Sequence, residues 1–121
     1  MKKVIVTGGA GFIGSHMVDL LLKKKYTVLV IDNLIGGHLN NNSHHKKNKN
    51  FIFKNINIRK KILDKNLFKN VDYVYHFAGI GDIVPSIEHP SNYMMTNVQG
   101  TINVLEAAKK AKIKKFVYAA S

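Results

Sequence analysis

Short apolar runs rich in β-branched residues recur along the chain and predict strands. The run Val4–Val6 shows no alternation with polar residues, which is typical of a strand buried on both faces. The run at 51–58 alternates partly between apolar and polar residues, so we expect it nearer the edge of a sheet. The expected strands are 3–7, 27–31, 51–58, 71–76 and 115–120.

Apolar residues at helical spacing predict two longer helices, at 12–25 and 91–112. Lysines close the first helix, and Ser91, just after Pro90, can cap the second. A shorter helix is expected at 60–68. We expect the apolar stripe of each long helix to face the core. The first stripe is Ile13, Met17, Leu20 and Leu21, and the second is Met94, Val98, Ile102, Leu105 and Ala108.

Two segments have no periodicity and are expected to be loops. The segment 33–50 is rich in asparagine and glycine, and the segment 79–90 contains both prolines. Buried strands that alternate with amphipathic helices predict an α/β fold with a doubly wound, Rossmann-like parallel sheet of about five strands. The length of 121 residues suits a single domain spanning 1–121.

A glycine-rich stretch, TGGAGFIG, follows the first expected strand and opens the first expected helix. In this context Gly8 allows a tight turn, Gly11 lets the backbone approach a pyrophosphate, and Gly14 lets the helix pack closely against the strand. The free N–H groups at the helix start then suit phosphate oxygens. The pattern predicts a dinucleotide site.

The second expected strand ends at Asp32, about 20 residues further on, as the dinucleotide fingerprint requires. A carboxylate there accepts hydrogen bonds from the adenosine ribose and repels a 2′-phosphate. No arginine follows it, because the next residues are Asn33 and Leu34. This arrangement favours NAD over NADP.

The net charge of +12 comes almost entirely from lysine, because Arg59 is the single arginine. Base-edge and bidentate phosphate recognition favour arginine, so we interpret the scattered lysines as a solvated surface rather than a nucleic-acid site. The absence of cysteine excludes a disulfide framework or a thiolate nucleophile. No signal-peptide pattern and no apolar run of about 18 residues is present, so we expect a cytoplasmic protein without a membrane partner.

Four stretches in order resemble the NAD-dependent epimerase/dehydratase family of extended short-chain dehydrogenases/reductases, which acts on nucleotide sugars. They are TGGAGFIG, VIDNL, VDYVYHFAG and the long stretch from SIEHP to the C-terminal AAS. The resemblance covers nearly the whole chain and is to the N-terminal part of a UDP-sugar 4-epimerase-like enzyme. It implies an isomerase that retains NAD, oxidises the sugar transiently at C4 and re-reduces it, and is a homodimer when complete.

The resemblance also implies roles for individual residues. The glycine loop would hold the pyrophosphate, the end of the second strand the adenosine ribose, and the end of the fourth strand the nicotinamide ribose. Asn97 would tie the long helix to a neighbouring strand, and Ser121 would hydrogen-bond the sugar hydroxyl. The implied cofactor residues are Gly8, Gly11, Phe12, Ile13, Gly14, Asp32, Asn33, Asn57, Ile58, Phe77, Ala78, Gly79 and Asn97.

Two positions depart from the family pattern. Asn57 stands where the family usually has an aspartate that reads the adenine amine, although an amide oxygen can also accept from that amine. Gly81 stands near the place where some 4-epimerases carry a substrate-binding lysine, which weakens the match to the UDP-glucose type.

The Tyr-x-x-x-Lys pair of the family is absent, because no tyrosine of this chain has a lysine four residues later. In the family that pair lies beyond the position of Ser121. We therefore expect the N-terminal part of a longer enzyme, inactive alone, or else a non-catalytic NAD-binding module. A nucleotide-sugar 4,6-dehydratase or decarboxylase of the same family is the alternative to an epimerase.

The histidines are interpreted as structural rather than catalytic or metal-binding. His38, His44 and His45 lie in the asparagine-rich segment with no acidic residue or cysteine nearby in sequence to complete a site, so no metal is expected. His76 ends a buried strand beside the expected cofactor position and is interpreted as a packed, hydrogen-bonded residue rather than a general base.

Overall fold

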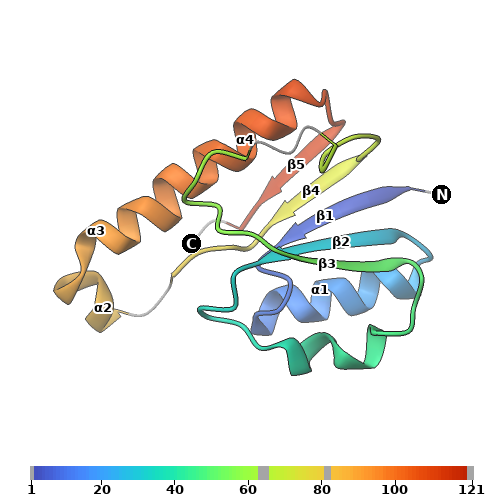
Figure 1. The fold of residues 1–121 in the computed structure, drawn as a ribbon, viewed down its shortest axis with the longest axis horizontal. Coiled ribbons are helices and arrows are strands. Elements are labelled where there is room, and N and C mark those ends of the chain that lie inside the picture. Colours follow the sequence, from blue (N-terminus) through green and yellow to red (C-terminus); the bar gives the residue numbers. More distant parts are fainter. Residues whose placement is uncertain (1, 63–65, 81–82, 120–121) are drawn as a thin grey trace.

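A five-stranded, all-parallel sheet with strand order β3-β2-β1-β4-β5 forms the centre of the computed structural model (Figure 1). The structure describes residues 2–62, 66–80 and 83–119. This order confirms the doubly wound, Rossmann-like fold class. The strands are β1 (Lys3–Thr7), β2 (Thr27–Asp32), β3 (Phe51–Asn55), β4 (Tyr73–His76) and β5 (Lys115–Tyr118).

Helices cover both faces of the sheet, with α1 on one side and α4 on the other (Figure 1). A 3₁₀ helix, η1, lies on the α1 side, and a π-helical segment, η2, precedes α4. No helix in the described part of the chain has the length and hydrophobicity of a bilayer span. The helices are α1 (Phe12–Lys23), η1 (Leu39–His45), α2 (Ile83–Glu88), α3 (Pro90–Tyr93), η2 (Met94–Gln99) and α4 (Gly100–Lys110).

Alternate residues of the central strands divide the apolar core into two layers. One layer joins Val18 and Leu21 of α1 to the strand residues Val4, Val6 and Val28. The other places the intervening strand residues against α4 and the chain that follows β3; its buried members include Ile5, Leu29, Ile31, Val74, Val104 and Ala108. Both faces of β1 and β2 are therefore buried, which explains why their apolar runs do not alternate with polar residues.

The expected core stripe of α1 is wrong at two of its positions. Leu21 is buried, but Ile13 is 66% exposed and Leu20 is also exposed. The face against the sheet is instead formed by Gly14, Val18 and Leu22, with Leu21 beside them. Gly14 determines which face of α1 packs on the sheet, because only a glycine fits where the first turn of α1 contacts the backbone of the loop after β1.

The expected core stripe of the second long helix is wrong at all but one position. Ala108 is buried, whereas the side chains at the other four positions are exposed: Met94, Val98, Ile102 and Leu105. The buried face of α4 carries Gly100, Asn103 and Val104 instead. Asn103 can point inward because its Nδ2 donates to the Ile58 carbonyl at 2.7 Å, which satisfies a buried polar group.

Several expected boundaries also differ from the structure. The segment 33–50 contains η1, and the segment 79–90 contains α2. Within 60–68, the described residues form a bend, irregular chain and a turn rather than the expected helix. The third and fourth strands are shorter than expected, and α1 ends two residues early, while the described part of the fifth strand ends at Tyr118. The position of β3 at the edge of the sheet is confirmed.

A buried hydrogen-bonded chain joins the ends of β1 and β4 to the helix above them. His76 is 2% exposed, with its Nδ1 2.6 Å from Thr7 Oγ1 and its Nε2 2.9 Å from Thr101 Oγ1. The Thr101 hydroxyl donates its proton to the Asn97 carbonyl at 2.7 Å, so it must accept from the imidazole. His76 therefore carries a proton on Nε2.

The Thr7 hydroxyl completes this chain. It donates to the unprotonated Nδ1 of His76 and accepts from the Ala78 N–H at 3.2 Å. Burial disfavours the charged imidazole and lowers the pKa of His76 from 6.5 to about 4. The interpretation of His76 as a packed, hydrogen-bonded residue is confirmed by this geometry.

We expect Gly14→Ala to destabilise the protein. Alanine normally favours a helix over glycine, but a Cβ at Gly14 would lie 2.1 Å from the Gly8 carbonyl oxygen. The expected loss in the free energy of unfolding is about 2 kcal/mol, measured by urea denaturation. Gly36→Ala is the matched control, because a Cβ there meets nothing within 4 Å. Equal stability of the two variants would contradict the close contact.

We expect acid to destabilise the protein through His76. The unfolded chain takes up a proton near pH 6.5 and the folded chain only near pH 4, so stability rises with pH across this window and is fully present above it. Since one pKa unit corresponds to about 1.4 kcal/mol, the loss on acidification is roughly 3 kcal/mol. Urea unfolding at pH 7 and pH 4.5 measures it. The His76→Gln variant should lack this part of the pH dependence, and an unchanged dependence would contradict the assignment.

Candidate functional site

A cleft of about 640 Å³ opens at the carboxyl ends of the strands. It is bounded by the loops after β1, β2 and β4, together with the segment after β3 and the start of the helical region at 89–96. The chain leaves β1 toward α1 on one face and leaves β4 toward α4 on the other, so the cleft lies at the point where the strand order reverses. Open parallel sheets bind ligands at this point.

The glycine-rich loop forms the floor of the cleft between β1 and α1. Gly8 has φ +71°, and a Cβ there would lie 2.8 Å from the Ala78 nitrogen, so the turn requires glycine. Gly11 lines the cleft and begins α1 without any side-chain cap, and the first turn contains no acidic residue. No acidic residue of α1 itself therefore offsets the positive end of the helix dipole where it meets the cleft, which suits an anionic group.

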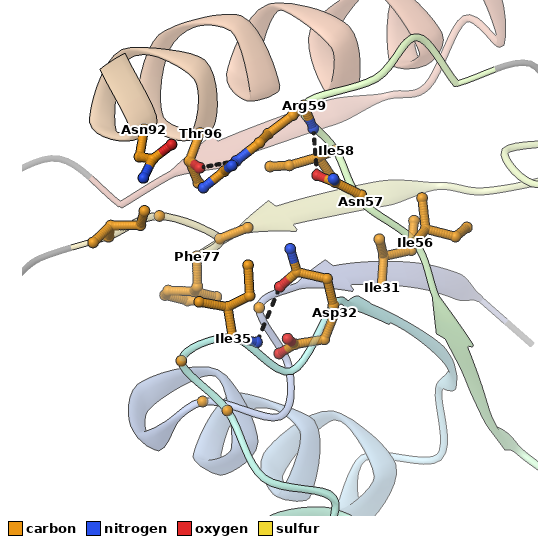
Figure 2. A pocket seen from close by; sticks show the side chains of 18 of the residues that line it. Ile31, Asp32, Ile35, Ile56, Asn57, Ile58, Arg59, Phe77, Asn92 and Thr96 are labelled. Atoms are coloured by element: carbon orange, nitrogen blue, oxygen red, sulfur yellow. Dashed lines mark hydrogen bonds between the residues drawn. The ribbon is translucent and has the colours of Figure 1, made fainter. Parts of the chain in front are cut away.

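Asp32, at the end of β2, ties this loop to the strand and also lines the cleft. Its Oδ2 accepts from the Ala10 N–H at 3.0 Å and its Oδ1 from the Leu34 N–H at 2.7 Å. Each carboxylate oxygen keeps a further lone pair for another donor. Next to it, Asn33 Oδ1 accepts from the Ile35 N–H at 3.2 Å, which fixes the turn (Figure 2).

The opposite wall of the cleft is formed by the chain after β3. Asn57 Oδ1 accepts from the Arg59 N–H at 3.0 Å, and Arg59 Nε donates to Thr96 Oγ1 of η2 at 2.7 Å (Figure 2). The Ile58 side chain is buried against Gly100, where a Cβ would lie 2.8 Å from it. A glycine at the start of α4 therefore admits Ile58 to the edge of the cleft.

The segment after β4 lines the third side of the cleft with Phe77, Ala78 and Gly79. Asn97 holds this segment, because its Oδ1 accepts from the Ile80 N–H at 2.8 Å and its Nδ2 donates to the Ile80 carbonyl at 3.0 Å. Both halves of the amide are thus used to fix the backbone beside the cleft. Asn97 itself lies in an adjoining hollow that it shares with His76 and Thr101.

The structure brings most of the expected cofactor residues into one cleft. Four expected residues do not line it. The side chains of Phe12 and Ile13 are exposed, Gly14 packs against the Gly8 backbone, and Asn97 lines the adjoining hollow. Ser121 and Gly81 lie outside the described residues. The expected residues that line the cleft are Gly8, Gly11, Asp32, Asn33, Asn57, Ile58, Phe77, Ala78 and Gly79.

Several residues that line the cleft were not identified from the sequence. Arg59 directly follows Asn57 and Ile58, and its cationic side chain was the one available signal. The other such residues with polar side chains come from the segment at 89–96, whose expected stripe indicated the wrong face. These residues are His89, Asn92, Tyr93 and Thr96.

Comparison with known proteins agrees with this geometry. The family model of the NAD-dependent epimerase/dehydratase family matches residues 4–121. A protein of Methanocaldococcus jannaschii, named as a candidate UDP-glucose 4-epimerase, is 44% identical over 119 residues, which cover 98% of this chain and 37% of that protein. The chain thus spans less than two-fifths of this relative's length.

Two solved structures are similar over almost the whole chain. A UDP-N-acetylglucosamine 4-epimerase of Methanobrevibacter ruminantium, in complex with UDP-N-acetylmuramic acid, has a TM-score of 0.90 and 33% identity over 99% of this chain and 38% of its own. The dTDP-glucose 4,6-dehydratase DesIV of Streptomyces venezuelae, with NAD bound, has a TM-score of 0.87 and 35% identity over 94% and 38%. The chain belongs to the NAD-dependent epimerase/dehydratase family, whose cofactor is NAD.

Proposed function

We propose that this chain binds NAD in the cleft and forms the cofactor-binding part of a nucleotide-sugar 4-epimerase. One observation carries the proposal: the uncapped start of α1, the Asp32 carboxylate and the segment after β4 line the same cleft. An anion site, a ribose acceptor and an extended wall, arranged in this order, match the parts of a dinucleotide.

The residues of the cleft fit NAD on steric and hydrogen-bonding grounds. A Cβ at Gly11 would approach only the Gly8 carbonyl oxygen and would otherwise point into open space. The glycine therefore leaves the first turn of α1 accessible to the pyrophosphate. Asp32 and Asn33 would accept from the adenosine ribose, and Asn57 and Ile58 would lie along the adenine. Phe77, Ala78 and Gly79 would follow the cofactor toward its nicotinamide ribose.

Three other residues would act on the backbone of the cleft rather than on the cofactor. Gly14 lets α1 approach Gly8, and Asn97 fixes the segment after β4. Phe12 and Ile13 are the first two residues of α1, and their backbone N–H groups have no partner within the helix. These N–H groups, rather than the exposed side chains, would meet the pyrophosphate.

The complete protein, as proposed, acts on a nucleotide sugar. When bound, NAD would accept a hydride from C4 of the sugar and return it to the opposite face of the same carbon. Ser121 would hydrogen-bond the reacting hydroxyl, and a Tyr-x-x-x-Lys pair from further along the complete protein would exchange the proton. The 4-epimerases among the relatives support this activity.

Two alternatives to the epimerase are retained. A 4,6-dehydratase shares the hydride step at C4, and similarity to DesIV supports it; a decarboxylase of the same family shares it as well. A non-catalytic NAD-binding module is the alternative of another class. The homodimer stays a prediction, for which the exposed apolar residues Met94, Val98, Ile102 and Leu105 offer a contact surface.

We expect Asp32→Asn to weaken NADH binding. The variant keeps the shape of the side chain but removes the charge that strengthens its hydrogen bonds to the ribose, which should lower affinity roughly tenfold. Titration of NADH fluorescence measures the change. The wild type should bind NADH more tightly than NADPH, and the variant should discriminate less, because the 2′-phosphate no longer meets a carboxylate.

The control for this experiment is Asp72→Asn. Asp72 directly precedes β4, at the amino ends of the strands and away from the cleft; there it accepts from the Lys3 N–H at 3.0 Å and pairs with Lys114 at 3.5 Å. Its replacement should leave NADH affinity unchanged. Equal affinity of wild type and Asp32→Asn would contradict the ribose-binding role.

We expect the complete protein to convert a UDP-sugar into an isomer of unchanged mass, detected by mass spectrometry with chromatographic separation of the epimers. Ser121→Ala should lower kcat by roughly a hundredfold through loss of the hydroxyl that assists proton exchange. Ser43→Ala, at an exposed serine of η1, is the matched control and should have no effect. A product lighter by one water would identify the dehydratase instead, and one lighter by carbon dioxide the decarboxylase.

A further inference from the structure

Three metal-ligating side chains meet on the α1 side of the molecule, outside the cleft. Asp19 projects from α1, while His44 and His45 end η1. His44 Nε2 lies 2.9 Å and His45 Nε2 2.5 Å from the same oxygen, Asp19 Oδ1. All three ligand atoms lie within 4.8 Å of one another. The two imidazoles thus present the same kind of nitrogen to one carboxylate.

The surrounding contacts hold this arrangement before any ligand binds. The His45 side chain is 14% exposed and its ring lies 5.8 Å from that of Phe51, at the start of β3. The two imidazole rings are 3.9 Å apart. Asp19 is therefore held by α1 and His45 by its contact with Phe51 of β3, so less side-chain entropy is lost when a ligand binds.

The hydrogen bonds of the cluster suit cation binding. Both imidazoles lie against the same carboxylate oxygen, Asp19 Oδ1, so an ion held between them would meet two nitrogens and one oxygen. A neutral imidazole can carry its proton on Nδ1 and leave Nε2 free, so binding through Nε2 needs only a change of tautomer.

We propose that Asp19, His44 and His45 form a binding site for a divalent transition-metal ion of the zinc class, with water completing its coordination. Two imidazoles and one carboxylate are ligands that Zn²⁺, Co²⁺ and Ni²⁺ accept, whereas Mg²⁺ and Ca²⁺ require mostly oxygen ligands. Ligand atoms around tetrahedral Zn²⁺ are about 3.3 Å apart, so each imidazole nitrogen would need to move away from Asp19 Oδ1 by less than about 1 Å.

The site has a structural consequence because η1 supports the glycine-rich loop. Asn41 Nδ2 donates to the Ala10 carbonyl at 2.7 Å, and Asn42 Nδ2 donates to the Gly9 carbonyl at 3.1 Å. A metal ion at the end of η1 would clamp this helix to α1 and so hold both asparagines in place. None of the three ligands lines the cleft, so the ion's role is structural rather than catalytic.

The test is a Zn²⁺ titration of tag-free protein in competition with a chromogenic chelator, because a histidine tag would bind the metal itself. The wild type should take up one equivalent of Zn²⁺ into a saturable site. Co²⁺ should give the visible absorption of a four-coordinate nitrogen and oxygen site. His44→Ala should lower Zn²⁺ affinity more than about tenfold. Because the His44 side chain is 56% exposed, its removal should leave the fold intact, which circular dichroism checks.

Two further variants make the result specific. Asp19→Asn keeps the size of the side chain but removes the anionic ligand, and it should lower affinity as His44→Ala does. His38→Ala, at an exposed histidine of the same segment, should bind Zn²⁺ as the wild type does. Equal Zn²⁺ binding by wild type, His44→Ala and Asp19→Asn, or no saturable binding by the wild type, would overturn the proposal and leave a hydrogen-bonded contact. The titration uses no NAD, so its outcome is independent of the proposed cofactor.

Discussion

The close contact between α1 and the loop after β1 is the constraint on which the rest of this structure depends. Gly14 lies against the Gly8 carbonyl, and Gly8 in turn lies against the Ala78 backbone, with no space for a Cβ at either glycine. The contact brings the first turn of α1 to the ends of β1 and β4. It therefore decides where the helix begins, which way its free amides point and how narrow the floor of the cleft is.

The strands and the glycine-rich loop could be predicted because their signals are local. A strand buried on both faces has no polar alternation, and the turn at Gly8 combines a positive φ with a close approach to the Ala78 backbone that excludes a side chain. For this reason β1, β2 and Gly8 follow from short windows of sequence. The helix faces could not be predicted in the same way. Apolar periodicity ranks side chains by hydrophobicity, whereas α4 turns a glycine and an amide toward the core because Ile58 and its carbonyl fit them.

The candidate site divides along the same line. Asp32 ends a buried strand about 20 residues after the glycine-rich loop, so a spacing rule finds it, whereas Asn33 follows from the family resemblance. Arg59 and Thr96 meet only because η2 is packed beside the chain after β3, and no pattern in either segment indicates the other. The cluster of Asp19 with two histidines was missed for the same reason: the acidic residue that the asparagine-rich segment lacks is supplied by α1.

The central position of β1 has a consequence for how the chain folds. Its pairing with β2 and that of β2 with β3 join segments close in sequence, whereas its other edge waits for β4; Thr7 and His76, for example, are separated by 69 residues. Closing the longer loop costs more chain entropy, so the β3–β2–β1 half can assemble first. When β4 pairs with β1, β4 and the helical region beyond it add the second side of the cleft to a first side that already contains the glycine-rich loop.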